Sequence, residues 1–401
     1  MYPEFDYLHF FTHNILMYKL LGFWRPDKEM KYKMLYHCYT ATCTAVWVAY
    51  LLSQITYIST NIQNVSEVTA TLFVTITFSM DLIKMLVIYR NMNYIKLLIK
   101  NLNNPIFQVK CAKHYEIATN AKTINKILFY YCFCLGWVTD TVWAIVPFLG
   151  DEKTTLVRGW FPYDETKPIG FTCTYIFQTV ETVWNTMLCL NLDTFTGNLL
   201  IQIGLQCDLL CATLESLEDF HVVDGILDQN TVENKLALLK DNNKFSETML
   251  ENLIVCITHH REIMRMAKNI ENIHKTSVFV LFTGGAVTLC SCLFQLSMVT
   301  VGTTEFFMLL CYLLAMLTEQ FIYCWFGNEV IYKSSLILQS AYNTPWLQCN
   351  IKFQKVLLQF MTQTYRPISL KAGGLFTMSI LVYISILKTS YSYFTLLKKI
   401  Q

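Results

Sequence analysis

Seven apolar stretches, each long enough to cross a lipid bilayer, run through this chain of 401 residues. A hydrocarbon core of about 30 Å requires roughly 20 apolar residues in a helix. Charged residues make up only 15% of the chain, against about 25% in soluble domains. We therefore expect an all-α membrane protein with seven transmembrane helices. The expected spans are Cys38–Ile58, Val68–Tyr89, Ile127–Leu149, Thr172–Leu192, Val278–Val301, Phe306–Phe326 and Gly374–Leu397.

Lysine and arginine residues alternate between the loops, and this alternation predicts the orientation of the chain. Positively charged loops stay on the cytoplasmic side of a membrane. The first loop, Ser59–Glu67, has no Lys or Arg, whereas the second, fourth and sixth loops are rich in both. These three loops should therefore be cytoplasmic, which places the N-terminus in the cytoplasm and the C-terminus outside. Their basic residues include Lys96, Lys100, Lys110, Lys113 and Lys122, then Lys235, Lys240, Lys244, Arg261, Arg265, Lys268 and Lys275, and finally Lys333, Lys352, Lys355 and Arg366.

The tripeptide Asn64-Val65-Ser66 lies in the first loop and agrees with this orientation. An Asn-x-Ser/Thr sequence is an acceptor for N-glycosylation, which requires an extracellular position. Asn64 is therefore a candidate glycosylation site. The alternative is a chance tripeptide that lies too near the bilayer to be modified.

Two of the cytoplasmic segments carry apolar residues at helical spacing and should form a cytoplasmic helical layer. They are Asn243–Lys275 and Gln348–Thr364, and the helix of the fourth span should continue to Glu215 because no polar break follows it. The expected parts of the chain are 1–212 (spans one to four), 213–276 (a cytoplasmic helical loop), 277–327 (spans five and six), 328–372 (a cytoplasmic helical segment) and 373–401 (span seven).

Several classes of function are disfavoured by composition. A net charge of +2 without a basic tract gives no indication of nucleic-acid binding. The segment Met1–Lys33 lacks a compact apolar centre, so a cleaved signal peptide is not expected. Most of the fifteen cysteines lie inside apolar spans, where a thiol acts as a small apolar side chain. We expect no metal, no cofactor and no enzyme activity, because no metal-ligand spacing or nucleophile–base set is present. His259-His260 is interpreted as part of a cytoplasmic helix surface.

Three motifs resemble those of insect odorant receptors. In the fourth span, Asp193-Thr194-Phe195 is followed by Gln206, Leu209 and Leu210. The segment Pro367–Gly374 is expected to open the last helix, and the terminal run Ser390–Leu397 is similar to the C-terminal signature of that family. Gustatory receptors typically carry a Gln-Phe pair where Lys398 and Lys399 stand, and the odorant co-receptor has a longer insertion between spans four and five. The resemblance therefore indicates an odorant-specific tuning subunit.

This resemblance implies a non-selective cation channel of four subunits, mixed with the co-receptor, in the plasma membrane of olfactory sensory neuron dendrites. The seventh helix would line the pore. Leu396 and Ile400 are the candidate gate, because rings of apolar side chains exclude water from a pore; the alternative is that Leu396 packs in a core. Lys388 lies in the same span, and we expect it to pair with Glu319 or Glu329 or to be hydrated.

A small volatile ligand, such as an alcohol, aldehyde, ester or aromatic compound, should bind in the outer halves of spans two to five. The alternative for each candidate residue is a core or lipid-facing position. Asp140 could bind an amine or an alcohol, and we favour a structural or hydrogen-bonding role over an amine counter-ion. Asp81 and Lys84 are interpreted as a pair on one helix face. The candidates are Phe73, Ile76, Thr77, Met80, Phe133, Gly136, Trp137, Asp140, Val183, Met187, Ser291 and Phe294.

The sequence patterns disfavour two other classes of membrane protein, G-protein-coupled receptors and transporters. A G-protein-coupled receptor requires the opposite orientation, and this chain has neither Asp/Glu-Arg-Tyr after span three nor Asn-Pro-x-x-Tyr in span seven. A transporter would carry internal repeats or broken helix pairs, which the seven unequal spans do not show. A gustatory-type ligand-gated channel is the remaining alternative.

Overall fold

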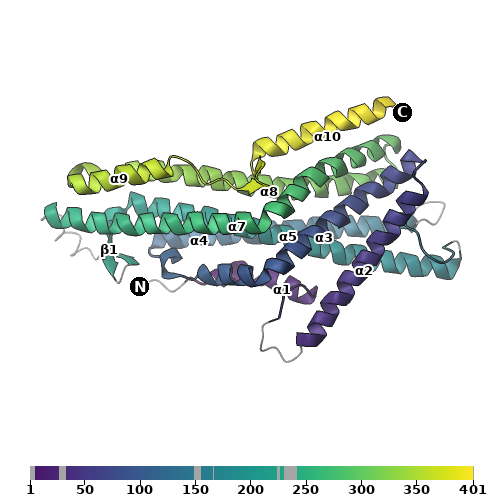
Figure 1. The fold of residues 1–401 in the computed structure, drawn as a ribbon, viewed down its shortest axis with the longest axis horizontal. Helices are drawn as coiled ribbons and strands as arrows, with labels where there is room; N and C mark the ends of the chain where they lie inside the picture. Colours follow the sequence, from purple (N-terminus) through teal and green to yellow (C-terminus); the bar gives the residue numbers. More distant parts are fainter. Residues whose placement is uncertain are drawn as a thin grey trace.

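The computed structural model describes residues 5–26, 33–148, 155–165, 167–223, 226–229 and 242–400. Long helices make up most of it (Figure 1). In chain order the elements are η1 (Tyr7–Phe10), α1 (Thr12–Leu20), α2 (Lys33–Thr60), α3 (Val65–Asn101), η2 (Pro105–Phe107), α4 (Ala112–Ile145), η3 (Val146–Phe148), α5 (Pro168–Glu215), η4 (Leu217–Asp219), β1 (Phe220–Val223), β2 (Ile226–Gln229), α7 (Asn242–Met298), α8 (Thr304–Tyr342), η5 (Trp346–Gln348), α9 (Ile351–Thr364), β3 (Lys371–Ala372), β4 (Phe376–Thr377) and α10 (Ile380–Ile400).

The membrane-spanning segments correspond to these helices. Within the described residues, six helices are long and apolar enough to cross a membrane, namely α2, α3, α4, α5, α7 and α8. The seventh expected span is α10, a helix of 21 residues, which measures about 31 Å at 1.5 Å per residue. The prediction of an all-α membrane protein is therefore confirmed.

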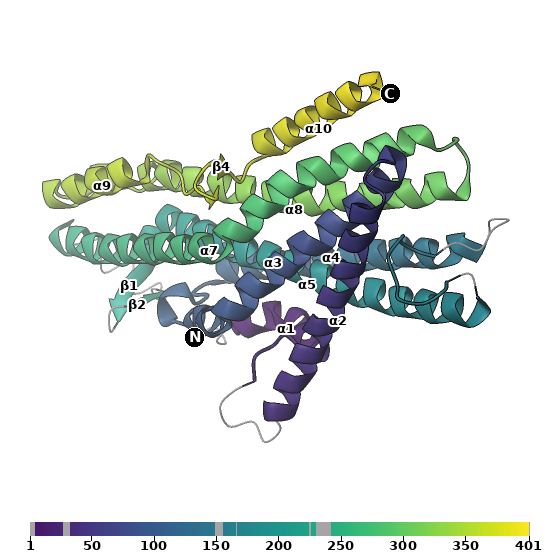
Figure 2. The ribbon, with the colours of Figure 1, turned by 45° about the vertical axis from the view of Figure 1, so that its right-hand side comes forward.

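Several helices continue well beyond the bilayer and build a second layer. α5 has 48 residues and reaches Glu215 as expected, and α7 is a single helix of 57 residues. The extended ends of α5, α7 and α8 lie together with α9 and the β1–β2 hairpin in the left half of Figure 1. The view in Figure 2 shows the same grouping, with α2 and α10 in the other half. The second layer and the membrane-spanning bundle thus share their helices.

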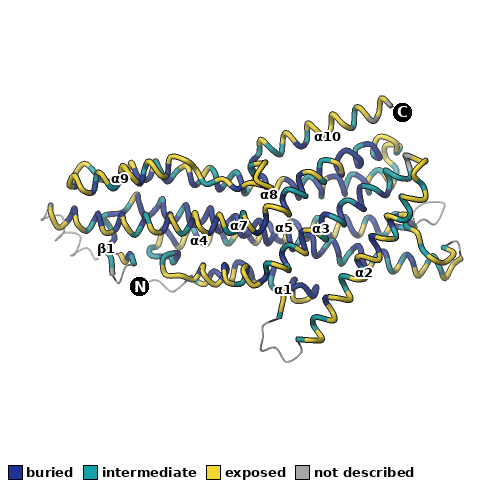
Figure 3. The backbone as a smooth tube through the Cα atoms, in the orientation of Figure 1, coloured by how far each residue is buried: buried dark blue, intermediate teal, exposed yellow. Residues whose placement is uncertain are grey.

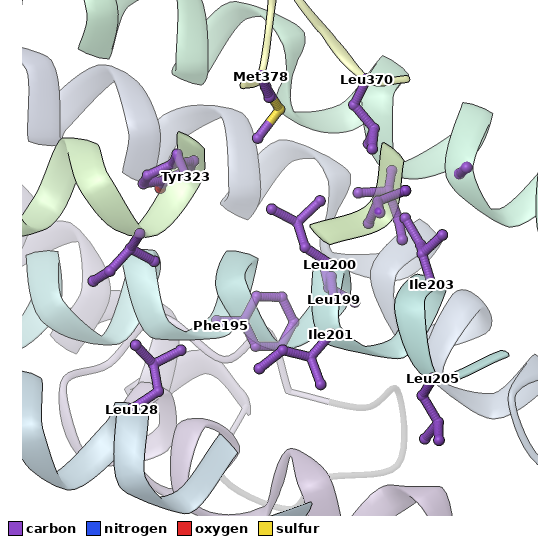
Figure 4. Packing of buried hydrophobic residues seen from close by; sticks show 14 of the residues in the cluster. Leu128, Phe195, Leu199, Leu200, Ile201, Ile203, Leu205, Tyr323, Leu370 and Met378 are labelled. Atoms are coloured by element: carbon purple, nitrogen blue, oxygen red, sulfur yellow. The ribbon is translucent and has the colours of Figure 1, made fainter. Parts of the chain in front are cut away.

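The core is centred on α5. Of its most apolar window, 89% is buried inside the protein, and Figure 3 shows this buried centre between the more exposed α2 and α10. Several polar residues on α5 form internal hydrogen bonds: Asn198 Nδ2 donates to the carbonyl of Phe10 at 2.7 Å, and Asn191 pairs with Asn14. The close-up in Figure 4 shows Phe195, Leu199, Leu200, Ile201, Ile203 and Leu205 of α5 packed near Leu128, Tyr323, Leu370 and Met378.

The expected start of the last span was wrong. The segment Pro367–Gly374 does not open a helix, because Gly373 and Gly374 have φ of 59° and 77° and form the turn of the β3–β4 hairpin. Glycine adopts this left-handed conformation without steric cost. The hairpin is attached to α7, since the Gly373 N–H donates to the carbonyl of Lys275 at 2.9 Å. α10 therefore begins at Ile380, after the hairpin.

The interpretation of His259-His260 as a helix surface was also wrong. Both side chains are buried because α5 and α9 cover this part of α7. His259 Nε2 lies 3.0 Å from Gln206 Oε1 on α5, and the ring of His260 lies 5.6 Å from that of Phe360 on α9. Gln206, part of the family-like motif, thus joins α5 to α7 in the second layer. All fifteen cysteines are free thiols, in agreement with the structural interpretation.

Candidate ligand-binding site

A cavity of about 100 Å³ lies between α3, α4, α5 and α8. Its walls are mostly apolar, and residue Val157 of the loop between α4 and α5 closes one side. Such a small, largely apolar space with a few polar groups suits a small organic ligand. The lining residues are Val74, Thr77, Phe78, Asp81, Cys132, Leu135, Gly136, Thr139, Asp140, Trp143, Val157, Thr182, Asn185, Thr186, Cys189, Leu190, Asp193, Tyr312, Ala315, Met316, Thr318, Glu319 and Ile322.

Three of the predicted binding residues, Thr77, Gly136 and Asp140, line this cavity. Gly136 permits close packing of α4 on α5, because an added Cβ would overlap the side chain of Leu190. Ser291 and Phe294 lie on α7, which does not line the cavity. The other predicted residues lie on α3, α4 and α5 but face elsewhere, since residues one apart on a helix differ by about 100° in direction.

The predicted binding residues that do not line the cavity pack against other helices or face outward. Phe73 lies outside the cavity lining, with its ring 5.0 Å from that of Tyr312. Ile76 and Met80 face Gly284 on α7. Trp137 is 54% exposed, and the ring of Phe133 stacks on that of Phe129. The remaining four candidates, Val183, Met187, Ser291 and Phe294, are buried or half-buried outside the cavity lining.

One wall of the cavity carries polar groups from α4 and α5. Thr186 Oγ1 donates to Asp140 Oδ1 at 2.9 Å. Within the described part of the chain, Asp140 Oδ2, Trp143 Nε1 and Asn185 Nδ2 are buried and have no hydrogen-bond partner. Buried polar atoms without partners are uncommon, because each one loses its hydrogen bonds to water. We call Asp140, Trp143 and Asn185 the polar wall.

The floor of the cavity is a buried charge cluster that sequence reasoning only partly found. Lys84 Nζ on α3 lies 2.9 Å from Asp81, 2.9 Å from Asp193 on α5 and 2.5 Å from Glu319 on α8. Tyr323 donates a further hydrogen bond to Asp193 at 2.8 Å. The predicted Asp81–Lys84 pair is present, but it belongs to a network that joins three helices.

This cluster changes two expectations. Glu319 was one expected partner of Lys388, but it is bound by Lys84, whereas Lys388 is exposed on α10. Asp81, Cys189 and Glu319 have ligand atoms within 4.8 Å of one another, as in a metal site. Lys84 Nζ already lies within 3.5 Å of Cys189 and closer to both acids. The Lys84 ammonium group therefore occupies the position that a metal cation would take.

A vestibule of about 710 Å³ adjoins the cavity and shares Val74, Trp143 and Val157 with it. Val157 is held between the two spaces by a paired hydrogen bond with Gln178 on α5. Gln178 Nε2 donates to the Val157 carbonyl at 2.7 Å, and the Val157 N–H donates to Gln178 Oε1 at 3.3 Å. These two hydrogen bonds hold Val157 at the boundary between the vestibule and the cavity.

The expected pore helix, α10, lies at the edge of the chain (Figure 1). Ser390 Oγ donates to the carbonyl of Ala286 on α7 at 3.1 Å. Leu396 is 55% exposed, so it does not pack in the core of this chain. Ile400 ends the helix, but its side chain is outside the described residues. Asn64 is exposed at the start of α3.

The comparisons with known proteins agree on one family. The sequence model of the 7tm odorant receptor family matches residues 64–391. The chain is 21% identical to odorant receptor Or1 of Anopheles gambiae, over 100% of this chain and 97% of that one. It is also 21% identical to odorant receptor 46a, isoform A, of Drosophila melanogaster, over 95% of each chain.

The fold is also similar to that of a solved structure. The olfactory receptor OR5 from Machilis hrabei, in complex with eugenol, has a TM-score of 0.83 at 15% identity, covering 99% of this chain and 100% of that chain. This likeness extends the agreement to the three-dimensional arrangement of the helices. The chain belongs to the 7tm odorant receptor family.

Proposed function

We propose that this chain is the odorant-binding subunit of a ligand-gated, non-selective cation channel. In this proposal it forms a heterotetramer with the odorant co-receptor in the plasma membrane of olfactory sensory neuron dendrites. The observation that carries the proposal is the small, mostly apolar cavity with a polar wall, enclosed by four helices of an odorant-receptor chain. A site of this size and lining is suited to a volatile organic molecule.

The orientation of the chain follows from its charges. Basic residues concentrate in the segments that form the layer with α9 and the first half of α7. On the positive-inside rule this layer is cytoplasmic, and the vestibule opens to the exterior. Residues 1–212 would then hold the ligand cavity, together with Tyr312–Ile322 of α8, and residues 373–401 would supply the pore helix.

The proposed pore is built from one copy of α10 per subunit. Its exposed apolar residues include Leu396, and α10 contacts the rest of the chain on one side only (Figure 2). Four copies around an axis would bring these exposed faces together. A ring of leucine side chains blocks ions by excluding water from the narrow passage.

The decisive experiment records odorant-evoked current from cells that express this chain together with the co-receptor. A panel of volatile compounds is applied with and without block of G-protein signalling. A direct channel keeps its current under the block, whereas current that disappears selects a G-protein-coupled receptor. Omitting the co-receptor tests whether this chain needs it.

Replacing Leu396 with serine should raise the current in the absence of ligand by about tenfold or more, because a hydroxyl ring holds water in the closed pore. Basal current and its block by a pore-occluding cation are the measurements. Leu387→Ser is the matched control, since Leu387 lies about 180° around the helix from Leu396 and packs against the core. An unchanged basal current in Leu396→Ser would remove this residue from the gate.

Replacing Gln178 with leucine should release Val157 from its position between vestibule and cavity. Both the onset and the decay of the response to an odorant pulse should then accelerate by about two- to tenfold, because breaking two hydrogen bonds lowers the cost of moving Val157. Thr179→Val is the control, since Thr179 bonds only to the carbonyl of Tyr175 in its own helix. Equal onset and decay rates of the response in both variants would show that movement of Val157 does not limit entry and exit of the ligand.

A further inference from the structure

We propose that the cavity selects a ligand with a free hydroxyl group, an alcohol or a phenol, on a small apolar body. Asp140, Trp143 and Asn185 would bind that hydroxyl. The inference rests on the proposed function, because it assigns the chemistry of the ligand to the same cavity. It adds which functional group the ligand carries and which side chains recognise it.

The argument begins with the unpartnered atoms of the polar wall. Asp140, Trp143 and Asn185 are 6%, 6% and 1% exposed, so water reaches none of them freely. Each has a polar atom without a hydrogen-bond partner among the described residues, and all three side chains line one cavity. Two lie three residues apart on α4, and the third lies on the facing turn of α5. A ligand that bonds to these atoms would satisfy groups that the protein itself leaves unsatisfied.

The types of these atoms decide between functional groups. Trp143 Nε1 and Asn185 Nδ2 are donors, and a carboxylate oxygen such as Asp140 Oδ2 is an acceptor. A hydroxyl group both donates and accepts, so one hydroxyl can bond to Asp140 and to a neighbouring donor. An ammonium group only donates and leaves the two donors unpaired. A carbonyl or ether oxygen only accepts and leaves Asp140 unpaired, and a hydrocarbon satisfies none of them.

Thr186 strengthens the assignment to Asp140. Its hydroxyl donates to Asp140 Oδ1 and fixes the carboxyl plane, so Oδ2 is the atom left for the ligand. The donors of the charge cluster do not compete for it, because Lys84 is surrounded by Asp81, Asp193 and Glu319. The polar wall and the charge cluster are therefore separate sets of contacts in one cavity.

The rest of the lining sets the size and character of the ligand body. Val74, Phe78, Leu190, Met316 and Ile322 supply apolar surface in the same cavity. The cavity measures about 100 Å³, and an apolar cavity of about 150 Å³ in another protein accepts benzene. The cavity has about two thirds of that volume, so a short alkyl chain is the size that fits most readily, and a single ring requires small movements of the lining side chains.

The test uses compounds that differ only in the functional group. Cells expressing this chain and the co-receptor receive benzyl alcohol, benzaldehyde, benzylamine and ethylbenzene, and then the matched series 1-hexanol, hexanal, hexylamine and heptane. In each series that activates the receptor, the alcohol should act at a concentration roughly 10- to 100-fold lower than the other members. A lower effective concentration for the aldehyde, amine or hydrocarbon would overturn the proposal.

Variants then assign the preference to residues. Asp140→Leu and Asn185→Leu should each reduce the advantage of the alcohol over the hydrocarbon by about tenfold. Asp140→Asn is the second variant at that position, for the case in which the leucine fails to reach the cell surface. Val74→Ala enlarges the same cavity without touching the polar wall, so it should shift all members of a series alike. An alcohol preference that survives in all the polar-wall variants would contradict the assignment.

The outcome separates this inference from the proposed function. Current evoked by other volatile compounds, but by no alcohol or phenol, leaves the channel intact and overturns the hydroxyl preference. When no compound evokes current although the chain is at the surface, the channel proposal fails. Binding is then measured as the melting temperature of the solubilised full-length chain with benzyl alcohol or ethylbenzene. A rise with the alcohol alone that Asp140→Leu abolishes supports the inference, and equal shifts overturn it.

Discussion

Lys84→Met is expected to prevent most of the protein from reaching the cell surface. Lys84 Nζ is the shared cation of Asp81, Asp193 and Glu319, and all four side chains are buried. Removal of one partner from a buried ion pair costs about 3–5 kcal/mol, which is a large part of a total stability of about 5–15 kcal/mol. The melting temperature of the solubilised protein and its surface fraction are the measurements.

Two further variants identify the cause of this loss. Lys113→Met removes a solvent-exposed partner of Glu215 and should change stability little, since exposed pairs contribute about 0–1 kcal/mol. Combining Lys84→Met with Asp81→Asn and Glu319→Gln removes the uncompensated carboxyls and should restore part of the surface expression. A melting temperature of Lys84→Met equal to that of the wild type would show that the carboxyls do not need the lysine.

Gly327→Val is expected to abolish odorant-evoked current while leaving the cavity in place. Gly327 lies on α8 and packs against Met378, two residues before the start of α10. An added Cβ would lie 2.5 Å from Met378 Cβ and overlap the Met378 carbonyl oxygen. Because the obstacle is backbone, the start of α10 must move to accommodate valine. Overpacking of this kind costs about 1–3 kcal/mol. Current amplitude and melting temperature are measured together.

Gly204→Ala is the control for this substitution. Its Cβ would lie 3.1 Å from the aliphatic chain of Lys333, which is flexible and partly exposed. We expect nearly normal current from Gly204→Ala. Normal current from Gly327→Val as well would mean that close packing of α8 against Met378 does not position the pore helix.

The helices of this fold could be predicted from sequence because bilayer thickness imposes a length on every apolar segment. Long apolar runs such as Val68–Tyr89 lie inside the observed helices, and the continuation of α5 to Glu215 follows from the lack of a polar break. The last helix was misplaced at its start because Gly373-Gly374 was interpreted as part of the α10 span. The paired glycines are themselves a signal for a hairpin turn.

The candidate site was only partly predictable because the rotation of each helix about its axis is not visible in a chain of mostly apolar residues. Thr77 faces the cavity, whereas Ile76 and Met80 on the same helix face α7. The partners of Lys84 come from helices that are 109 and 235 residues away in the sequence. A buried lysine predicts that acids will be near it, but which acids are near depends on the order of the helices in space.

The unbroken course of α5 has a mechanical consequence. Asn185 in the cavity wall and Glu215 at the far end belong to one helix without an interruption, and they are separated by about 45 Å along its axis. A rigid rod converts a small change of angle into a large displacement, so a tilt of about 3° at Asn185 moves Glu215 by about 2 Å. Glu215 holds Lys113 and Ser340, on α4 and α8. Binding of a small ligand beside Asn185 can thus displace the residues around Glu215, at the other end of α5.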